Sequence, residues 1–334
     1  MNESQKTTTL PPTIAVVGDM LLDEYLMGTQ SYSLNEGVPS FHFSERRFSP
    51  GGAANVAMNL AAQGYRVYLI GVVGDDQAGR RLLELLPPSI NKDFVSADRS
   101  FATIVKRRAV DSNLRIIMKL EQSETPPLNK VNKYALLESV TEVCQHVSTM
   151  VVSDYGYGVV EDELVKRLAA MKRLRALLVD PRGQRVDKYQ GAGVLTPNQE
   201  EFYQLINRKC SNINDTIDEA RKLIRNHKIG SIVLKHGGQG SWLVTADYVY
   251  RMPPLYTGDI KSAVGAGDAL IASMAGVLSA GNSLVEAFTV GNAAAACVLS
   301  DAYTTVVSTK QIHDMMHAVN PEQFLQRCMV PTGL

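Results

Sequence analysis

Short apolar runs that each end in a polar residue or a glycine constrain the fold of this chain more than any other feature. They are TIAVVGD (13–19), TMVVSDYG (149–156), ALLVDPRG (176–183), GVLTPN (193–198) and SIVLKHGG (231–238). Strands that are buried on both faces of a parallel sheet have this nearly continuous hydrophobic character. From about residue 132 onward, such runs alternate with helical segments. The alternation predicts an α/β fold in which helices cover both faces of a mainly parallel sheet.

The polar residues that follow these runs predict where a ligand binds. Asp19, Asp154, Asp180, Asn198 and Lys235 each lie at the end of a predicted strand. Ligands of an open parallel sheet bind beyond the carboxyl ends of its strands. One such residue would mean little, but five in succession indicate a site.

Two segments have a different pattern. Residues 24–48 are rich in Tyr, Ser and Phe and predict short antiparallel strands. Residues 101–122 alternate polar and apolar positions, which predicts strands with one face in water or over a ligand. We therefore expect a single domain over residues 13–320 with a small β appendage formed by these two segments. Residues 1–12 are expected to form a flexible N-terminal tail.

Composition narrows the class of protein. The 34 Lys and Arg residues balance the 34 Asp and Glu residues, which argues against a nucleic-acid-binding protein. The four cysteines are far apart and show no zinc-binding spacing. The N-terminus lacks the apolar segment of a signal peptide, and the apolar stretches near 269–280 and 287–299 are too short to span a bilayer. We expect a cytoplasmic protein with no nucleic acid and no membrane among its partners.

A glycine-rich turn precedes an apolar helix in the stretch GAGDALIASMAG. The backbone N–H groups of Gly265, Ala266 and Gly267 would face an anion at the start of this helix, where the helix dipole adds to the attraction. With a phosphoryl group there, Asp268 is placed to take a proton from an attacking hydroxyl. The positive helix end is expected to lower the pKa of Asp268 and keep it ionised. The alternative is a plain turn whose aspartate only favours the helix start.

Two further motifs each have two interpretations. NQEE places Asn198 and Glu201 on one helical turn, where their oxygens suit Mg²⁺ bound through water, but this spacing also fits a helix cap with a first-turn acid. KHGGQG (235–240) allows a close approach of a nucleotide, or forms a hairpin turn. The chain contains no Walker A motif, and no G-x-G-x-x-G follows its first strand, which disfavours P-loop and dinucleotide-binding proteins.

Charged residues near the appendage are candidates for binding a sugar. Asp19 and Asp23 are close enough to share a pocket, and paired carboxylates bind sugar hydroxyls well, although each alone would more often be a surface residue. Lys106 and Arg108 fall on one face of a predicted strand. Exposed basic residues are usually only solvated.

Taken together, GGAANVAMNLA, LTPNQEEF and GAGDALIASMAG resemble segments of the PfkB, or ribokinase-like, carbohydrate kinases, from about residue 13 to 312. Within that family VVGDMLLDEYLMG, TIVKRR, VVSDYGYG and VDPRG are most similar to the heptose 7-phosphate kinases of ADP-heptose and lipopolysaccharide synthesis. The resemblance implies a three-layer α/β/α ribokinase-like fold with a β lid formed by residues 24–48 and 101–122. It implies an ATP- and Mg²⁺-dependent kinase whose acceptor is a phosphorylated sugar, D-glycero-D-manno-heptose 7-phosphate. A kinase for another sugar or sugar phosphate, and a non-catalytic sugar-binding relative, are the alternatives.

The resemblance also implies roles for individual residues. Asp268 would be the catalytic base, and the backbone of Gly265, Ala266 and Gly267 would form the anion hole. The acceptor would be bound by Asp19, Asp23, Gly51, Gly52, Asn55, Lys106, Arg108 and Asp154. The nucleotide would be bordered by Asn198, Glu201, Lys235, Gly237, Gly240 and Asn292, with Asn198 and Glu201 as the magnesium motif, acting through water.

The chain departs from the family pattern at several positions. Ser262 and Ala263 stand where the family usually has Asp-Thr, beside a monovalent-cation site, so dependence on K⁺ is not expected. Tyr157 and Arg182 replace lysines of the heptose kinases, and Arg182 keeps the positive charge. The exposed lid predicts a homodimer formed through it. Bifunctional relatives carry a C-terminal nucleotidyltransferase, whereas this sequence ends at Leu334, so we expect a separate nucleotidyltransferase to act downstream.

Overall fold

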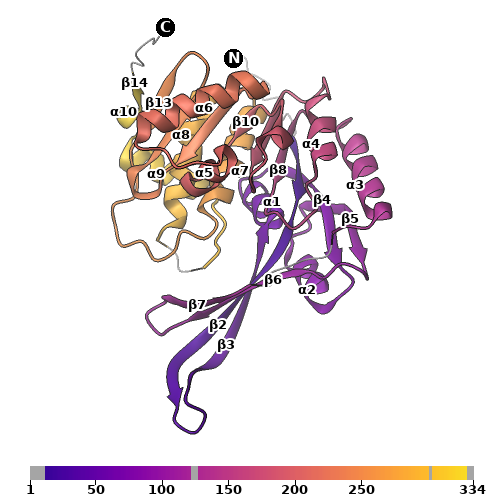
Figure 1. Ribbon diagram of the computed structural model, residues 1–334, viewed down its shortest axis with the longest axis vertical. Helices are drawn as coiled ribbons and strands as arrows, with labels where there is room; N and C mark the ends of the chain where they lie inside the picture. The colour runs from indigo at the N-terminus through magenta and orange to yellow at the C-terminus, as the bar shows by residue number, and fades with distance from the viewer. Residues whose placement is uncertain (1–11, 122–126, 301–302, 329–334) are drawn as a thin grey trace, which may run out of the picture.

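A ten-stranded sheet forms the centre of the protein (Figure 1). The computed structural model describes residues 12–121, 127–300 and 303–328. The strand order is β14-β13-β12-β11-β10-β9-β8-β1-β4-β5. The parallel strands are β1 (Thr13–Gly18), β4 (Arg66–Gly74), β5 (Ile90–Asp98), β8 (Thr149–Ser153), β9 (Ala176–Asp180), β10 (Val194–Leu195) and β11 (Ser231–Lys235). An antiparallel edge follows, made of β12 (Ser241–Val244), β13 (Val249–Met252) and β14 (Gln326–Cys328). The predicted mainly parallel sheet is confirmed.

Helices cover both faces of this sheet. One face packs against α3 (Lys130–Val143), α4 (Asp162–Ala169), α5 (Gln199–Ile206) and α6 (Ile213–His227). The other packs against α1 (Ala53–Ala62), α2 (Gln77–Leu85), α7 (Ala266–Ser279) and α8 (Leu284–Val298), with α9 (Thr309–Val319) outside α8 and a short α10 (Pro321–Phe324). The described residues also form the 3₁₀ turns η1 (Val186–Tyr189) and η2 (Gly237–Gln239).

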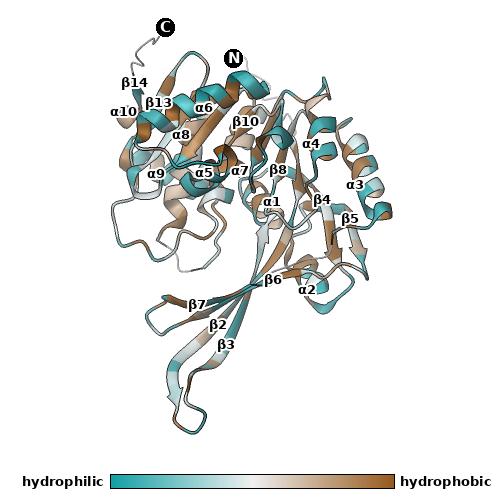
Figure 2. Cartoon of the chain, in the orientation of Figure 1, coloured by the Kyte–Doolittle hydropathy of each residue, from teal (hydrophilic) through white to brown (hydrophobic). Residues whose placement is uncertain are grey.

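The hydrophobic cores on the two faces of the sheet divide the residues of its strands between them. On β1, Ala15 and Val17 belong to the core under α3 to α6, whereas Ile14 and Val16 belong to the core under α1, α2, α7 and α8. Successive side chains of a strand point to opposite faces, so burial on both faces requires the continuous apolar runs seen in the sequence. In Figure 2 the central strands are largely brown, and the outer faces of α3 and α6 carry teal. The three-layer α/β/α arrangement is confirmed.

No helix in the described part of the chain is long and apolar enough to cross a membrane.

A second sheet of four strands extends away from the larger one (Figure 1), in the order β3-β2-β6-β7. It consists of β2 (Met20–Ser33), β3 (Val38–Gly52), β6 (Ile104–Val110) and β7 (Ile116–Leu120), and is called the lid sheet below. The expectation of short strands in residues 24–48 is wrong, because β2 and β3 have 14 and 15 residues. Parallel pairing with β6 along Leu21 to Met27 gives β2 a neighbour on both sides, which supports this length. Residue 122 and residues 1–11 of the predicted tail lie outside the described residues.

Candidate active site

The polar residues at the strand ends gather at one edge of the larger sheet. The strands β11, β10, β9, β8 and β1 are consecutive neighbours, so Lys235, Asn198, Asp180, Asp154 and Asp19 follow one another along that edge. Asn198 and Lys235 pair through the backbone, and the Nζ atom of Lys235 lies 2.8 Å from Oδ1 of Asp180. The backbone N–H of Asp154 donates to the carbonyl of Asp180. The site predicted from the strand ends is therefore one continuous row of polar groups.

Asp268 lies beside this row, in the first turn of α7. Gly265 precedes the helix with a φ of 86°, and no side chain caps the helix start. The Asp268 side chain is buried, and both of its carboxylate oxygens accept hydrogen bonds. Nδ2 of Asn55 donates to Oδ2 at 2.7 Å, and the hydroxyl of Tyr155 donates to Oδ1 at 3.1 Å. These two donors fix the plane of the carboxylate.

The expected lowering of the Asp268 pKa is wrong. Burial raises the pKa of Asp268 from 3.8 to about 7, and the nearby Asp180 adds to the increase. The hydrogen bonds from Asn55 and Tyr155 act in the lowering direction but are outweighed. A helix N-terminus favours a negative charge by about 0.3–1 kcal/mol, whereas full burial moves a carboxyl pKa by up to roughly 3–5 units. Asp268 therefore exchanges its proton near neutral pH.

The two glycines before Asp268 allow polar groups to approach the start of α7. A Cβ atom at Gly267 would lie 3.0 Å from Nζ of Lys235, and one at Gly265 would lie 3.0 Å from Nδ2 of Asn55. Any side chain at either position would press on these groups. An ammonium group beside an uncapped helix start is a favourable environment for an anion.

The base of the lid sheet contains a buried ion pair. Nη1 of Arg108 lies 2.6 Å from Oδ1 of Asp23, and both side chains are buried. The hydroxyl of Thr304 donates to Oδ2 of Asp23 at 2.9 Å. Arg108 therefore neutralises Asp23, and its contacts do not favour the phosphate-binding role expected for it.

Lys106 has a different environment on the same strand. Two residues from Arg108 on β6, it lies on the same face of the lid sheet. Its Nζ atom lies 4.7 Å from the centre of the Tyr155 ring and 5.5 Å from that of Tyr157. Burial lowers the pKa of Lys106, and Arg108 and Arg182 act in the same direction. This cation stands next to the tyrosine that contacts Asp268.

Asp19 organises the loop after β8. Its carboxylate accepts hydrogen bonds from the backbone N–H groups of Tyr155 (2.8 Å), Tyr157 (3.2 Å) and Val159 (3.1 Å). Burial, together with the negative charge of Asp154, raises the pKa of Asp19 to about 6. These hydrogen bonds position Tyr155, so Asp19 acts on the candidate active site indirectly, through the loop after β8.

Asp154 is engaged in the same loop. It accepts hydrogen bonds from the N–H of Gly156 at 2.9 Å and from the hydroxyl of Tyr189 at 2.6 Å, and it forms an ion pair with Lys188. Its carboxylate is thus surrounded by partners from the chain itself.

Gly51 and Gly52 end β3 next to the two aspartates expected to bind sugar. A Cβ atom at Gly51 would lie 2.9 Å from Oδ2 of Asp23, and one at Gly52 would lie 2.3 Å from the backbone oxygen of Asp19. The glycines allow β3 to pass close to both residues, and α1, which carries Asn55, begins immediately afterwards.

Asn198 and Glu201 form the helix cap that was the alternative to a metal motif. Oδ1 of Asn198 accepts from the N–H of Glu201 at 2.9 Å, and Oε2 of Glu201 accepts from the N–H of Asn198 at 2.7 Å. The remaining Oε1 of Glu201 lies 3.2 Å from Nη1 of Arg182. Among the described residues there is no cluster of three or more His, Cys, Asp or Glu side chains that could hold a metal ion. The donor set fits only an ion such as Mg²⁺, which keeps most of its water and substrate-phosphate ligands.

The KHGGQG segment is a hairpin turn. The N–H of His236 donates to the carbonyl of Gly240, which closes η2 between the antiparallel strands β11 and β12. A Cβ atom at Gly237 would meet nothing within 4 Å, so this side of the turn is open. Asn292, on α8, holds the start of β12 by accepting from the Ser241 hydroxyl at 2.6 Å.

Most of the sequence matches a family model. Residues 12–311 match the model of the pfkB family carbohydrate kinases. The chain belongs to the pfkB family of carbohydrate kinases. This pfkB family member is also similar to two bifunctional HldE proteins. That of Blochmanniella floridana is 31% identical over 97% of the chain, and that of Photorhabdus laumondii is 32% identical over 90%. The chain spans 66% and 63% of the lengths of these relatives.

Solved structures of sugar kinases share the fold. Phosphofructokinase-2 from Escherichia coli, solved in complex with potassium, superposes with a TM-score of 0.77 at 20% identity, covering 93% of this chain and 99% of its own. Arabidopsis thaliana ribokinase, complexed with ribose and ATP, has a TM-score of 0.70 at 16% identity, covering 92% and 99%. The ribokinase-like fold of this pfkB family member is thereby established.

Sequence reasoning missed two residues of the candidate site, Tyr155 and Thr304, and one ion pair. Tyr155 directly follows the strand-end residue Asp154, so extending the strand-end argument by one residue would have found it. Asp180 was placed at the sheet edge, but its ion pair with Lys235 was not foreseen. Thr304 belongs to a segment without any motif, and nothing in the sequence pointed to its contact with Asp23.

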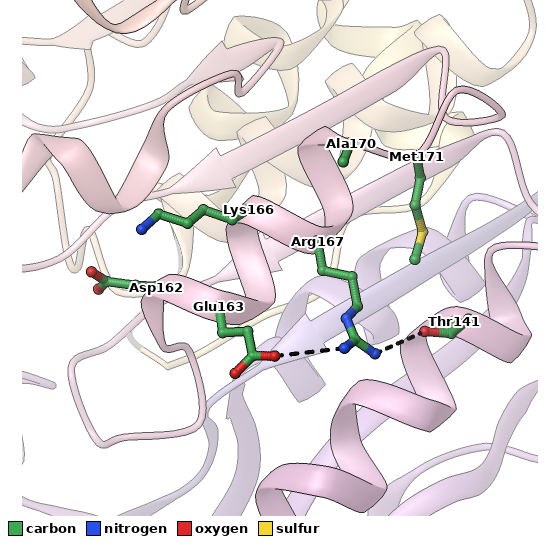
Figure 3. Close-up of a pocket in the computed structure, with 7 residues that line it drawn as sticks. All are labelled: Thr141, Asp162, Glu163, Lys166, Arg167, Ala170 and Met171. Carbon is green, nitrogen blue, oxygen red and sulfur yellow. Dashed lines mark hydrogen bonds and ion pairs between the residues drawn. The ribbon is translucent and has the colours of Figure 1, made fainter.

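A surface hollow between α3 and α4 lies apart from these residues (Figure 3). Arg167 spans it, contacting Glu163 at 3.5 Å and the hydroxyl of Thr141 at 3.5 Å. The rest of its lining is Asp162, Lys166, Ala170 and Met171. None of these is a residue of the candidate active site.

Proposed function

We propose that the chain is an ATP- and Mg²⁺-dependent kinase that transfers the γ-phosphate of ATP to a hydroxyl of D-glycero-D-manno-heptose 7-phosphate. The observation that carries the proposal is Asp268, a buried carboxyl with a pKa of about 7 beside an uncapped helix start and Lys235. The resemblance to the heptose 7-phosphate kinases and the matches to HldE proteins support this acceptor. The likeness to phosphofructokinase-2 favours a second candidate, a kinase for another sugar phosphate.

In this proposal Asp268 is the general base. It removes the proton of the acceptor hydroxyl while that oxygen bonds to the γ-phosphorus, and the bond from the phosphorus to the leaving ADP oxygen breaks. A base with a pKa near the working pH is the most effective in such a step. Asn55 and Tyr155 hold the two oxygens of Asp268 so that its carboxylate faces the acceptor in one orientation.

The helix start and Lys235 stabilise the phosphoryl group. In this proposal the Gly267 backbone N–H and the ammonium of Lys235 stabilise the negative charge of the transferred group, while the Ala266 N–H donates to the carbonyl of Ala263 within the turn. Bound Mg²⁺ would neutralise charge on the phosphates, and Glu201 would hold it through water with Oε1. Asn198 contributes by capping α5 and orienting Glu201.

Lys106 binds the phosphate of the acceptor in this proposal. It projects from the face of β6 that also carries Arg108, next to the ring of Tyr155. Arg108 has a different role, which is to pair with the buried Asp23 and hold it toward the sugar hydroxyls. Arg182 adds positive charge to the same region.

The lid sheet is also the proposed dimer interface. It exposes apolar side chains on its outer strands, namely Val38 and Phe43 on β3 and Ile117, Met118 and Leu120 on β7. Pairing of two lid sheets would bury this surface. Sedimentation of the wild-type chain as a dimer, and of a Met118→Glu/Leu120→Lys variant as a monomer, tests the interface.

A panel of acceptors tests the function. We expect ADP formation with heptose 7-phosphate to be efficient, and that with ribose and fructose to be poor. Lys106→Ala is expected to raise the KM for heptose 7-phosphate by on the order of 10-fold, because a charge-assisted bond to phosphate contributes about 1.5–3 kcal/mol. Lys172→Ala, at an exposed lysine that follows α4, is the matched control. Equal efficiency with an unphosphorylated sugar, or an unchanged KM in Lys106→Ala, would overturn the assignment of the acceptor.

A further inference from the structure

The base of the lid sheet has a second face, opposite the one that carries the proposed acceptor-binding residues. Side chains alternate along its strands, so Asp23 and Lys106 point to one face while their neighbours point to the other. On that other face Glu24 of β2 is paired with Arg107 of β6 and with Phe48 of β3. This face is turned toward α2, which lies beside the lid base in Figure 1.

Between this face and α2 lies a hollow of about 530 Å³, within the range of small-molecule sites. None of Asp23, Lys106 and Arg108 lines it, so it is separate from the candidate active site. The hollow is lined by Leu22, Glu24, Arg46, Phe48, Gln77, Ala78, Arg80, Arg81, Glu84, Val105 and Arg107.

The charges around the hollow are unbalanced. Arg80 is paired with Asp75 at 3.2 Å, and Arg46, Arg81 and Arg107 face Glu24 and Glu84, which leaves an excess of one positive charge. Glu24 is the buried centre of this arrangement, with 5% of its surface exposed. Its Oε2 accepts from Nε of Arg107 at 2.7 Å, and Nη1 of Arg46 lies 3.8 Å from its Oε1.

The contact with Glu24 holds one guanidinium in place. It uses Nε of Arg107, which leaves the Nη groups as donors. On the opposite wall, the Arg81 guanidinium lies 5.6 Å from the centre of the Phe48 ring and about half of its side chain is exposed, at 48%. Two guanidinium groups next to an apolar surface are suited to bind a ligand that carries both a phosphate and an apolar group.

We propose that this hollow is a binding site for a small organic phosphate. The phosphate is held by Arg81 and Arg107, and the apolar part lies on Phe48 and on the aliphatic floor formed by Leu22, Ala78 and Val105. The proposal does not depend on which sugar the chain phosphorylates. Because Glu24 already holds Arg107 in place, less side-chain conformational entropy is lost when the ligand binds.

Phenyl phosphate is the probe, and calorimetric titration of the full chain is the measurement. Arg81→Gln is expected to weaken binding by on the order of 10-fold or more, because a guanidinium–phosphate contact is charge-assisted. Arg81 is on the surface of α2, and among the described residues its one ion pair is with Glu84 within that helix, so this variant is expected to fold. Arg107→Gln is expected to weaken binding likewise, with thermal unfolding as a check because it uncovers Glu24.

Two controls make the result decisive. Arg173→Gln removes an exposed arginine outside the hollow and is expected to bind as the wild type does. Lys106→Ala, on the other face of β6, is also expected to bind normally. Unchanged binding in Arg81→Gln would overturn the proposal, as would loss of binding in Lys106→Ala alone, which would assign the phenyl phosphate to the active site. Failure of the proposed acceptor would leave these outcomes unaffected.

Discussion

Replacing Asp268 by asparagine is expected to stabilise the chain much more at alkaline than at acid pH. The folded state holds the Asp268 proton with a pKa of about 7, whereas an exposed aspartate has a pKa of 3.8. Between these values the folded state binds more protons than the unfolded state, so the free energy of unfolding falls as pH rises. The contribution is fully present below pH 3.8 and is lost as pH rises through 7. At 1.36 kcal/mol for each pKa unit, the loss between pH 5 and pH 8.5 amounts to about 3 kcal/mol.

Asparagine does not titrate, so the difference in unfolding free energy between variant and wild type isolates this effect. Groups that titrate in both proteins largely cancel from the difference. Urea unfolding at pH 5 and pH 8.5 is the assay, with Asp259→Asn, at an exposed aspartate, as the matched control. The free energy of unfolding of Asp268→Asn minus that of the wild type, its advantage, is expected to grow by about 3 kcal/mol from pH 5 to pH 8.5. The same difference for Asp259→Asn is expected to stay constant. A constant or shrinking advantage would refute the reasoning, since with a pKa lowered by the helix start Asp268 would be ionised in both states over this pH range and the advantage would not change.

Three more outcomes follow from the contacts of the site. Tyr155→Phe removes a hydrogen-bond donor that lowers the pKa of Asp268. The midpoint of the acid limb of the pH–rate profile is therefore expected to rise by about one pH unit or less. An unmoved midpoint would contradict the contact. Arg108→Ala leaves Asp23 buried without its ion-pair partner, and urea unfolding is expected to show a free energy of unfolding lower by about 3–5 kcal/mol. A decrease as small as that for a surface ion pair would contradict the burial. Exchanging K⁺ for tetramethylammonium at constant ionic strength is expected to leave the rate nearly unchanged, because Ser262 supplies no charged ligand for a cation; a strong dependence in coupled assays would contradict this.

The sequence predicted the parts of the fold that have a strong local signal. Parallel strands such as β1 and β9 are buried on both faces, so their apolar runs are visible without any knowledge of their neighbours. The hairpin between β11 and β12 was one of two interpretations of KHGGQG, but the pairing of β14 was not predicted, because β14 has only three residues and pairs with β13 across a long stretch of chain. The length of β2 depends on its pairing with β6, which is equally non-local.

The same distinction holds for the candidate site. Strand-end positions brought Lys235 and Asp180 to one edge, since that follows from topology alone. The contact of Tyr155 with Asp268 joins residues 113 positions apart, and side-chain geometry decides it. The sign of the Asp268 pKa shift was predicted wrongly because the local sequence shows the helix start but not the burial that outweighs it.

The turnover number of Asp268→Asn tests the central claim most directly. ADP formation would be followed with heptose 7-phosphate as acceptor, and ATP binding to the variant would be titrated separately. The account predicts that kcat falls by about 10²- to 10⁴-fold, because general-base assistance is lost, while the affinity for ATP stays nearly the same. A variant that keeps most of the wild-type turnover would contradict the assignment of Asp268 as the base.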